Sequence, residues 1–181
     1  MMNGKRIVFS GSGGQGVITA SVLLAEAAVI HEGLNAVQTQ TYGPEARGGA
    51  TRADVVISKE RINYPKVINP HILVCLTQEA YNKFSGIIRP GGLLLTDSHY
   101  VKPERKVDAR QVELGMYQAV MDEIGKPIVF NICMLGVLIG LTELVKGKSI
   151  IKVLEQKIDP IFMALNEKAL EIGLRLANHH T

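Results

Sequence analysis

The stretch that decides the fold class is Arg6-Ile7-Val8-Phe9-Ser10-Gly11-Ser12-Gly13-Gly14-Gln15-Gly16. Its first five residues form a short apolar run of the kind that becomes a buried strand. Glycines end this strand, and from Gln15 to Ile30 the apolar residues recur at spacings of three and four. That spacing predicts a helix that covers a sheet. A strand, a glycine-rich turn and a helix in this order indicate an α/β domain.

The rest of the chain continues this alternation. Further strands are predicted over residues 35–40, 53–58, 72–76 and 93–96, and helices over 78–88, 116–124, 131–144 and 149–158, with a last helix begun by Asp159-Pro160. Asn131 and Ser149 are expected to cap the two helices that they begin. We therefore expect one domain over residues 1–181, a three-layer Rossmann-like fold with a mainly parallel sheet and a helical C-terminal third.

Composition excludes several classes of protein. With 46% hydrophobic and 20% charged residues, the 181-residue chain has the balance of a folded protein and not of a disordered one. The longest strongly apolar run, Ile132 to Leu141, is half of the roughly 20 residues needed to cross a bilayer. No signal peptide is evident at the start, so a cytoplasmic protein without a membrane span is expected. A net charge of +3, scattered cations and the absence of tryptophan argue against nucleic-acid binding.

Metal and nucleophilic sites are not indicated. The two cysteines, Cys75 and Cys133, lie in separate apolar segments, and two thiolates cannot hold a four-iron cluster or a structural zinc ion. Both are therefore expected to be buried hydrophobic residues. Asp97, Ser98 and His99 are consecutive, and a catalytic triad requires convergence in space, so a turn is expected there. We predict no catalytic residue and no metal ligand in this chain.

Gly11, Gly13 and Gly16 satisfy the pattern G-x-G-x-x-G. In such a loop the glycines allow a tight turn, close approach of a phosphate and packing of the helix on the strand. The helix N-terminus adds N–H groups and a positive dipole end. Val17 and Ile18 occupy the positions where an ATPase loop needs lysine and a hydroxyl, so ATP hydrolysis is not supported. The residues alone leave two interpretations open, a cofactor contact or a purely structural turn.

A nicotinamide enzyme would need one more feature. Its second strand normally ends in a carboxylate that holds the ribose, about 20 residues after the glycines. Here that strand ends at Gln38-Thr39-Gln40, and the next carboxylate is Glu45. The dinucleotide-binding interpretation is therefore incomplete.

The second candidate segment is Thr41-Tyr42-Gly43-Pro44-Glu45-Ala46-Arg47-Gly48-Gly49. It leaves the second predicted strand, where loops of an open α/β sheet form the ligand crevice. Tyr42 offers a flat ring and a hydroxyl, Glu45 a carboxylate and Arg47 a fork for phosphate or carboxylate. Gly48 and Gly49 would allow close approach of the backbone. The alternative is a local ion pair between Glu45 and Arg47 that only stiffens a turn.

Together, the two glycine-containing segments resemble the gamma subunit of 2-oxoacid:ferredoxin oxidoreductases. The resemblance extends through Val55-Val56-Ile57-Ser58, Gln78-Glu79-Ala80 and Asn131-Ile132-Cys133-Met134-Leu135-Gly136, and so covers nearly the whole chain. The run Ala46-Arg47-Gly48-Gly49 is more similar to the 2-oxoglutarate type, since pyruvate-type chains more often have a second arginine in place of Ala46.

This resemblance implies a subunit that is not active alone, within a complex that converts a 2-oxoacid to acyl-CoA and reduces ferredoxin. In that family the alpha and beta chains bind thiamine diphosphate with magnesium, and iron–sulfur clusters lie in beta and often in a delta chain. Partners are therefore expected to be alpha and beta, with or without delta, and ferredoxin indirectly. Coenzyme A is the candidate ligand of the present chain.

The candidate binding residues are those of the two segments, namely Gly11, Ser12, Gly13, Gly14, Gln15, Gly16, Tyr42, Gly43, Glu45, Arg47, Gly48 and Gly49. We expect the amides of Gly13 to Gly16 and the guanidinium of Arg47 to meet phosphate, with Glu45 orienting Arg47 or contacting a partner. An equal alternative is that Tyr42 to Gly49 docks on the alpha chain. Two other functions stay open: a free-standing dinucleotide-binding oxidoreductase, and a binding or structural Rossmann-like protein.

Overall fold

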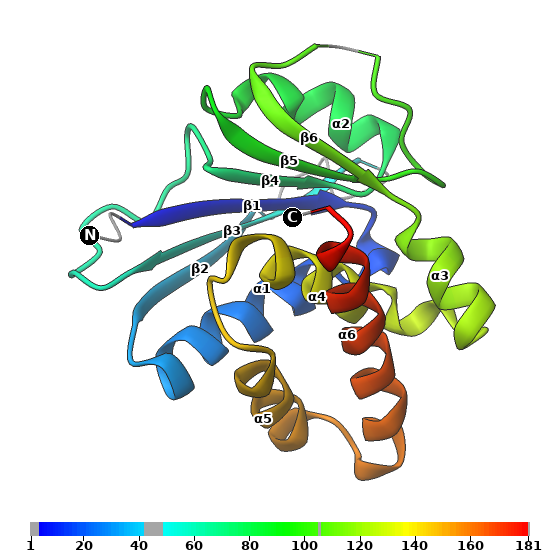
Figure 1. Ribbon diagram of the computed structural model, residues 1–181. Coiled ribbons are helices and arrows are strands. Elements are labelled where there is room, and N and C mark those ends of the chain that lie inside the picture. The colour runs from blue at the N-terminus through cyan, green and yellow to red at the C-terminus, as the bar shows by residue number, and fades with distance from the viewer. Residues whose placement is uncertain (1–3, 42–48, 105, 181) are drawn as a thin grey trace.

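A six-stranded sheet forms the centre of the molecule (Figure 1). The computed structural model describes residues 4–41, 49–104 and 106–180. Its strands are β1 (Lys5–Gly11), β2 (Asn35–Thr41), β3 (Thr51–Ser58), β4 (Ile72–Cys75), β5 (Gly92–Asp97) and β6 (Ala109–Leu114), in the spatial order β2-β3-β1-β4-β5-β6. The strand predictions for residues 6–10, 35–40, 53–58, 72–76 and 93–96 are confirmed to within a few residues at their ends.

The sheet is mainly parallel, as predicted. Strands β1, β4, β5 and β6 pair in parallel, whereas β3 is antiparallel to both β1 and β2. Of the six described strands, β3 therefore runs opposite to the other five. Consequently β2 and β3 are neighbouring antiparallel strands, and the carboxyl ends of the five strands other than β3 lie at one edge of the sheet.

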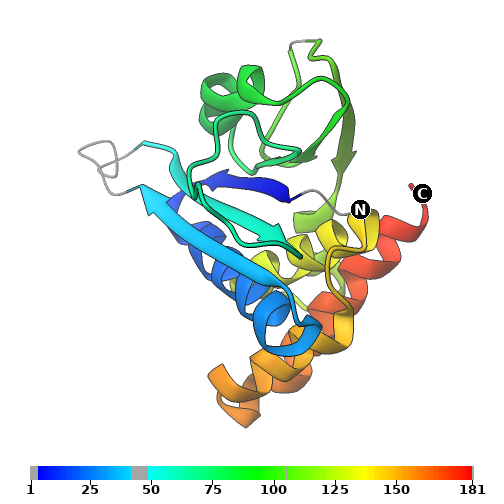
Figure 2. The same cartoon turned by 90° about the vertical axis from the view of Figure 1, so that its left-hand side faces the viewer.

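Helices cover both faces of the sheet, which gives three layers (Figures 1 and 2). Helix α2 lies on one face, while α1 and α4 lie on the other, with α6 packed against α4. The helices are α1 (Val17–Glu26), α2 (Gln78–Phe84), α3 (Met116–Glu123), α4 (Phe130–Thr142), α5 (Gly147–Lys157) and α6 (Met163–Asn178). A π-helix, η2 (Ala27–His31), extends α1, and the short 3-10 helices are η1 (Gly13–Gln15), η4 (Ser85–Ile87), η5 (Pro127–Val129) and η6 (Pro160–Phe162).

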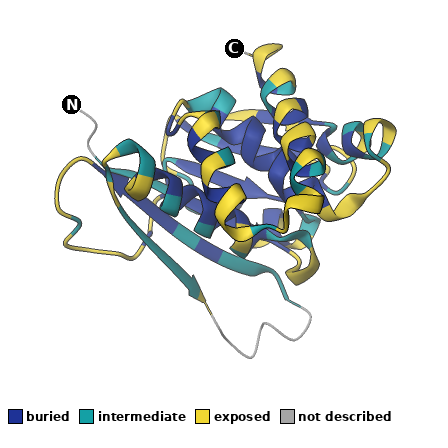
Figure 3. Cartoon of the chain, turned by 90° about the horizontal axis from the view of Figure 1, so that it is seen from below, coloured by how far each residue is buried: buried dark blue, intermediate teal, exposed yellow. Residues whose placement is uncertain are grey.

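The core consists of two hydrophobic clusters, one on each face of the sheet. Along β1, Ile7 and Phe9 face the larger cluster under α1 and α4, and Val8 faces the smaller one under α2. This alternation follows from the two-residue period of a strand, and both faces are apolar because both are covered. Figure 3 shows buried residues between the layers and exposed residues on the outer helix faces.

One strand was not predicted. No element was predicted for the segment Ala109–Leu114, but it forms the edge strand β6 beside β5. The exposed Arg110, Gln111 and Glu113 hide the alternation of apolar and polar residues that marks a strand, because only Val112 and Leu114 are buried. Charged side chains are common on edge strands, where they discourage pairing with another chain.

Two of the predicted helix caps are wrong. Asn131 lies inside the first turn of α4, which begins at Phe130, and Ser149 is the third residue of α5. The carboxylate of Glu32 serves α5 instead, because it accepts from the Lys146 N–H at 2.9 Å and from the Ser149 hydroxyl at 2.6 Å. These hydrogen bonds hold the pKa of Glu32 below its usual value.

The predicted start of the last helical segment at Asp159-Pro160 is confirmed. The Asp159 carboxylate accepts from the backbone N–H of Ile161 at 3.0 Å, and Pro160 is the first residue of η6. Proline suits this position because its missing N–H would have no partner within the helix. The helix α6 follows directly.

Candidate functional site

The glycine-rich loop connects β1 to α1 at the carboxyl edge of the sheet. Gln15 fixes its shape: the side-chain carbonyl of Gln15 accepts from the Ser12 N–H at 2.9 Å, and its amide donates to the carbonyl of Leu76 at 2.8 Å. Leu76 directly follows β4, the parallel neighbour of β1. The loop is thereby held at the carboxyl ends of β1 and β4. The helices that follow these two strands lie on opposite faces of the sheet, and open α/β sheets bind ligands at such a position.

The fold itself explains two of the loop glycines. A Cβ atom at Gly11 would lie 2.6 Å from the Gln15 side-chain oxygen. Gly16 has a φ of 68°, and a Cβ atom there would lie 2.6 Å from Nδ2 of Asn131. A left-handed backbone and a close neighbour both favour glycine at this position. These two residues therefore support the turn and the packing of the helix.

Gly13 and Gly14 differ from them. A Cβ atom at Gly13 would have Thr51 Oγ1 at 3.9 Å as its nearest described neighbour, and one at Gly14 would have no described atom within 4 Å. Neither residue has the positive φ that disfavours a side chain. Packing among the described residues therefore does not require glycine at these positions, and the backbone is left open to an incoming group.

The second candidate segment lies mostly outside the described residues: Tyr42, Gly43, Glu45, Arg47 and Gly48 fall in the gap at 42–48. Its two ends are described. Thr41 pairs with Arg52, and Gly11 pairs with Thr51. The Ser10 hydroxyl also donates to the Thr51 carbonyl at 2.9 Å. The segment thus begins and ends at the edge that carries the glycine-rich loop, with the half-buried Gly49 as its described candidate residue.

A pocket of about 510 Å³ adjoins the glycine-rich loop. Residues from α1, η5, the start of α4 and the segment between α5 and α6 complete it, among them Lys126, Ile128, Asn131, Lys157, Phe162 and Asn166. Lys157 forms an ion pair with Glu26 at 2.9 Å, whereas the exposed Lys126 has no carboxylate partner among the described residues. An apolar pocket with a cation and helix N–H groups suits a ligand with a long arm and an anionic end.

Sequence patterns did not point to these additional pocket residues as site residues. Asn131 was expected to cap a helix, but it is a buried residue that donates to the Gly16 carbonyl and lines the pocket. The available signal was a single amide in an otherwise apolar helix, since a buried amide needs a hydrogen-bonding reason. No local sequence pattern marks Lys126 or Lys157 as a pocket residue, because only the tertiary structure brings them to the glycine-rich loop.

Asp97, at the carboxyl end of β5, has a structural role. Its buried carboxylate accepts from the His99 N–H at 2.9 Å and from the Tyr117 N–H at 2.8 Å, which ties the strand to the start of α3. Burial raises the pKa of Asp97, and these hydrogen bonds oppose that rise. Residues 98–100 form a turn, as predicted from the consecutive Asp97, Ser98 and His99.

Both cysteines are fully buried, as predicted. Burial raises the pKa of Cys75 and raises that of Cys133 to about 12, so both remain thiols at neutral pH. The described residues contain no cluster of three or more His, Cys, Asp and Glu side chains suited to a metal ion. Across the described segments, we also find no helix with both the length and the hydropathy required to span a membrane.

Comparison with known proteins places this arrangement in a family. The model of the pyruvate ferredoxin/flavodoxin oxidoreductase family matches residues 6–176. The chain is 45% identical to a 2-oxoglutarate synthase subunit, KorC, from Methanocaldococcus jannaschii, over 92% of this chain and 88% of the relative.

Two solved structures share the fold. The gamma subunit of a keto/oxoacid ferredoxin oxidoreductase from Geobacter sulfurreducens superposes with a TM-score of 0.90 at 36% identity, over 98% of both chains. The 2-oxoglutarate:ferredoxin oxidoreductase from Magnetococcus marinus, with 2-oxoglutarate, coenzyme A and succinyl-CoA bound, has a TM-score of 0.89 at 23% identity. The whole of the present chain matches 32% of that longer chain. The sequence match, its coverage and the shared fold together establish that this chain belongs to the pyruvate ferredoxin/flavodoxin oxidoreductase family.

Proposed function

We propose that this chain is the gamma subunit of a 2-oxoglutarate:ferredoxin oxidoreductase and that its glycine-rich loop helps to bind coenzyme A. In the proposed complex, 2-oxoglutarate loses CO2, its succinyl group is transferred to the coenzyme A sulfur, and two electrons pass to ferredoxin. The 45% identity to a 2-oxoglutarate synthase subunit supports this substrate over pyruvate, as does Ala46 in the second segment.

The observation that carries the coenzyme A proposal is the open backbone at Gly13 and Gly14. A phosphate oxygen can approach a backbone N–H closely only where no side chain intervenes, and a Cβ atom at either residue would meet no described atom closer than 3.9 Å. The N-terminus of α1 adds its dipole at the same place. Gly13 to Gly16 would hold the phosphates, with Arg47 as a further phosphate contact.

The adjoining pocket fits the remainder of the same ligand. Coenzyme A has a long arm of hydrocarbon and amide groups that ends in a thiol, and the pocket of about 510 Å³ is lined largely by apolar residues such as Ile128 and Phe162. Lys126, exposed at this pocket, would provide a counter-charge for the phosphates. The buried Asn131 amide would hydrogen-bond to the arm.

The proposed complex requires partner chains for its redox chemistry. A four-iron cluster needs four thiolates, and this chain has two cysteines, both buried and both with a raised pKa. We therefore assign the clusters, thiamine diphosphate and magnesium to alpha and beta chains, with or without a delta chain, in a cytoplasmic complex. Residues 1–181 would form one domain within it.

The strand order argues against a free-standing nicotinamide enzyme. In such an enzyme the strand that provides the ribose-binding carboxylate lies next to β1. Here β3 separates β2 from β1, and β2 ends in Gln40 and Thr41. Gln38 is also engaged, since its side-chain amide donates to the Ser21 hydroxyl at 3.1 Å.

A substitution at Gly14 tests coenzyme A binding. Because the added methyl group of Gly14→Ala meets no described atom within 4 Å, the variant is expected to fold normally while blocking the phosphates. We expect its affinity for coenzyme A to fall about tenfold in isothermal titration, the loss of one charge-assisted hydrogen bond. Gly86→Ala is the matched control, since a Cβ atom there also meets open space, in η4. Equal affinity in wild type and Gly14→Ala would refute the proposed phosphate contact.

A second test separates ligand binding from subunit docking in the segment from Tyr42 to Gly49. If Arg47 binds phosphate, Arg47→Ala should raise the KM for coenzyme A in the assembled enzyme and leave assembly unchanged. If the segment instead docks on the alpha chain, the same variant should weaken assembly in size-exclusion chromatography and leave that KM unchanged. Intact acyl transfer with intact assembly would contradict both roles.

A further inference from the structure

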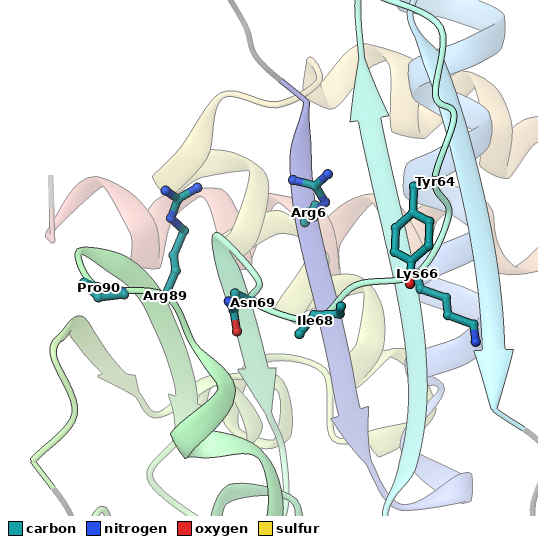
Figure 4. A pocket seen from close by; sticks show the side chains of 7 residues that line it. All are labelled: Arg6, Tyr64, Lys66, Ile68, Asn69, Arg89 and Pro90. Carbon is teal, nitrogen blue, oxygen red and sulfur yellow. The ribbon is translucent and has the colours of Figure 1, made fainter.

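A second groove, of about 410 Å³, lies far from the glycine-rich loop, at the opposite edge of the sheet (Figure 4). It is lined by Arg6 on β1, by Tyr64, Lys66, Ile68 and Asn69 in the segment before β4, and by Arg89 before β5. Arg6 precedes Gly11 by five residues, which corresponds to about 17 Å along an extended strand. The groove is therefore separate from the candidate coenzyme A site.

The charge of the groove is entirely positive. Its described lining contains Arg6, Lys66 and Arg89 and no carboxylate, and none of these three cations forms an ion pair with a described residue. Figure 4 shows Arg6 on β1 and Arg89 on the segment that leads to β5, so that β4 lies between them. Cations without carboxylate partners suit an anion with several oxygen atoms, such as a diphosphate, which can span two guanidinium groups.

His71 contacts both arginines, although it does not itself line the groove. Its Nδ1 atom accepts from the backbone N–H of Arg6 at 3.1 Å, and its Nε2 atom is in hydrogen-bond contact with the Arg89 guanidinium. Burial, and then the charges of Arg89, Lys5 and Arg6, lower the pKa of His71 to about 4, so the ring is neutral at pH 7. The His71 ring thereby links the start of β1 to the guanidinium of Arg89.

The other wall of the groove is flat and apolar. Tyr64 is 52% exposed and Ile68 is 65% exposed, although both are large hydrophobic residues. Figure 4 shows the Tyr64 ring over β3, across β1 from Arg89. An exposed aromatic ring beside cations provides a stacking surface next to a phosphate site, the combination that nucleotide-binding grooves use.

We propose that this groove binds a nucleotide, with its phosphates at Arg6 and Arg89 and its base against Tyr64 and Ile68. An inorganic anion would use the cations alone. A nucleotide explains both the cations and the exposed apolar wall. The site does not depend on the proposed coenzyme A contact, because it lies on other residues at the other edge of the sheet.

Calorimetric titration of the full chain with ADP, pyrophosphate and adenosine, at one fixed salt concentration, tests this proposal. We expect ADP to bind more tightly than either fragment, since only ADP engages both parts of the groove. Arg6→Gln and Arg89→Gln should each weaken ADP binding about tenfold, the effect of losing a charge-assisted contact. Tyr64→Ala should weaken ADP binding about fivefold and leave pyrophosphate binding unchanged.

Matched controls separate a site from general charge effects. Lys152→Gln removes one positive charge from an exposed position of α5 and should leave ADP affinity unchanged. Arg6→Lys retains the charge but loses the fork, so its affinity should lie between those of wild type and Arg6→Gln. An equal loss in Lys152→Gln, or no loss in either arginine→glutamine variant, would overturn the proposal.

NMR titration of the His71 ring provides an independent readout. The negative charge of a phosphate at Arg6 and Arg89 offsets the cations that lower the pKa of His71, so saturating ADP should move that pKa upward from about 4. The facing cations Arg89, Lys5 and Arg6 are unchanged in this experiment. An unaltered His71 titration in the presence of ADP would exclude the proposed phosphate position.

Discussion

Two groups of glycines in this protein have opposite structural roles. At the crossing of α4 and α6, the helices pack too closely for any side chain. A Cβ atom at Gly173 would lie 2.0 Å from the Cys133 carbonyl oxygen, and one at Gly136 would lie 2.5 Å from the Leu170 carbonyl oxygen. In the glycine-rich loop, a Cβ atom at Gly13 or Gly14 would meet no described atom closer than 3.9 Å. The comparison shows that a glycine explained by packing and a glycine that leaves room for a ligand can be separated by asking what its missing side chain would touch.

The largest expected effect is at the helix crossing. In Gly173→Ala the new methyl group would overlap backbone atoms of α4, which cannot rotate away as a side chain can. We expect a loss of about 3 kcal/mol or more in the free energy of unfolding. This loss outweighs the gain of about 1 kcal/mol that alanine brings to a helix interior. Urea unfolding followed by circular dichroism measures it, with Gly86→Ala as the control. Wild-type stability would show that the two helices move apart without cost.

Gly16 is expected to come second, since it combines both demands. Gly16→Ala places a side chain on a left-handed backbone with a φ of 68° and pushes it against Asn131. We expect a loss of about 2 kcal/mol in unfolding free energy. Thermal unfolding provides the measurement. A loss below that of the Asn131 variant described next would mean that the loop adopts another backbone conformation.

Asn131→Ala is expected to have a smaller effect, about 1 kcal/mol, because the amide makes a long hydrogen bond of 3.4 Å to the Gly16 carbonyl. The double variant Gly16→Ala/Asn131→Ala should lose less stability than the sum of the single losses, since the clashing amide is gone. A double-mutant cycle in urea measures this coupling. Strict additivity would show that the two side chains do not meet.

The smallest effect on stability is expected at Gly14. Gly14→Ala should remain within about 1 kcal/mol of the wild-type unfolding free energy, because the methyl group meets open space and the unfolded chain loses freedom. The same variant is expected to lose coenzyme A affinity, so that stability and binding separate at one residue. A large loss of stability would break the distinction between the two groups of glycines.

Much of the secondary structure followed from local patterns. The first strand, its glycine turn and its helix were predictable because adjacent residues specify them, and so was the start of η6 at Asp159-Pro160. The edge strand β6 was not predictable, because its exposed polar residues lack a clear period. The cap of α5 was also missed, since it comes from Glu32, more than a hundred residues earlier in the chain.

The candidate site divides in the same way. The glycine-rich loop and the family resemblance are visible in the sequence, because they depend on residue types in fixed order. The role of Asn131 and the contribution of Lys126 to the pocket are not visible there. Both depend on the start of α4 and the preceding η5 packing against the loop after β1.

By itself, the sequence determined a strand, a glycine turn and a helix at the start of an α/β chain, and it identified the family to which the chain belongs. Tertiary structure alone decided that β3 enters the sheet between β1 and β2 in the opposite direction, and that Arg6, His71 and Arg89 meet at one edge. The physical reason is the range of the forces involved. Local conformation depends on neighbouring residues, whereas strand pairing and the convergence of charges depend on hydrogen bonds and burial between residues far apart in the chain.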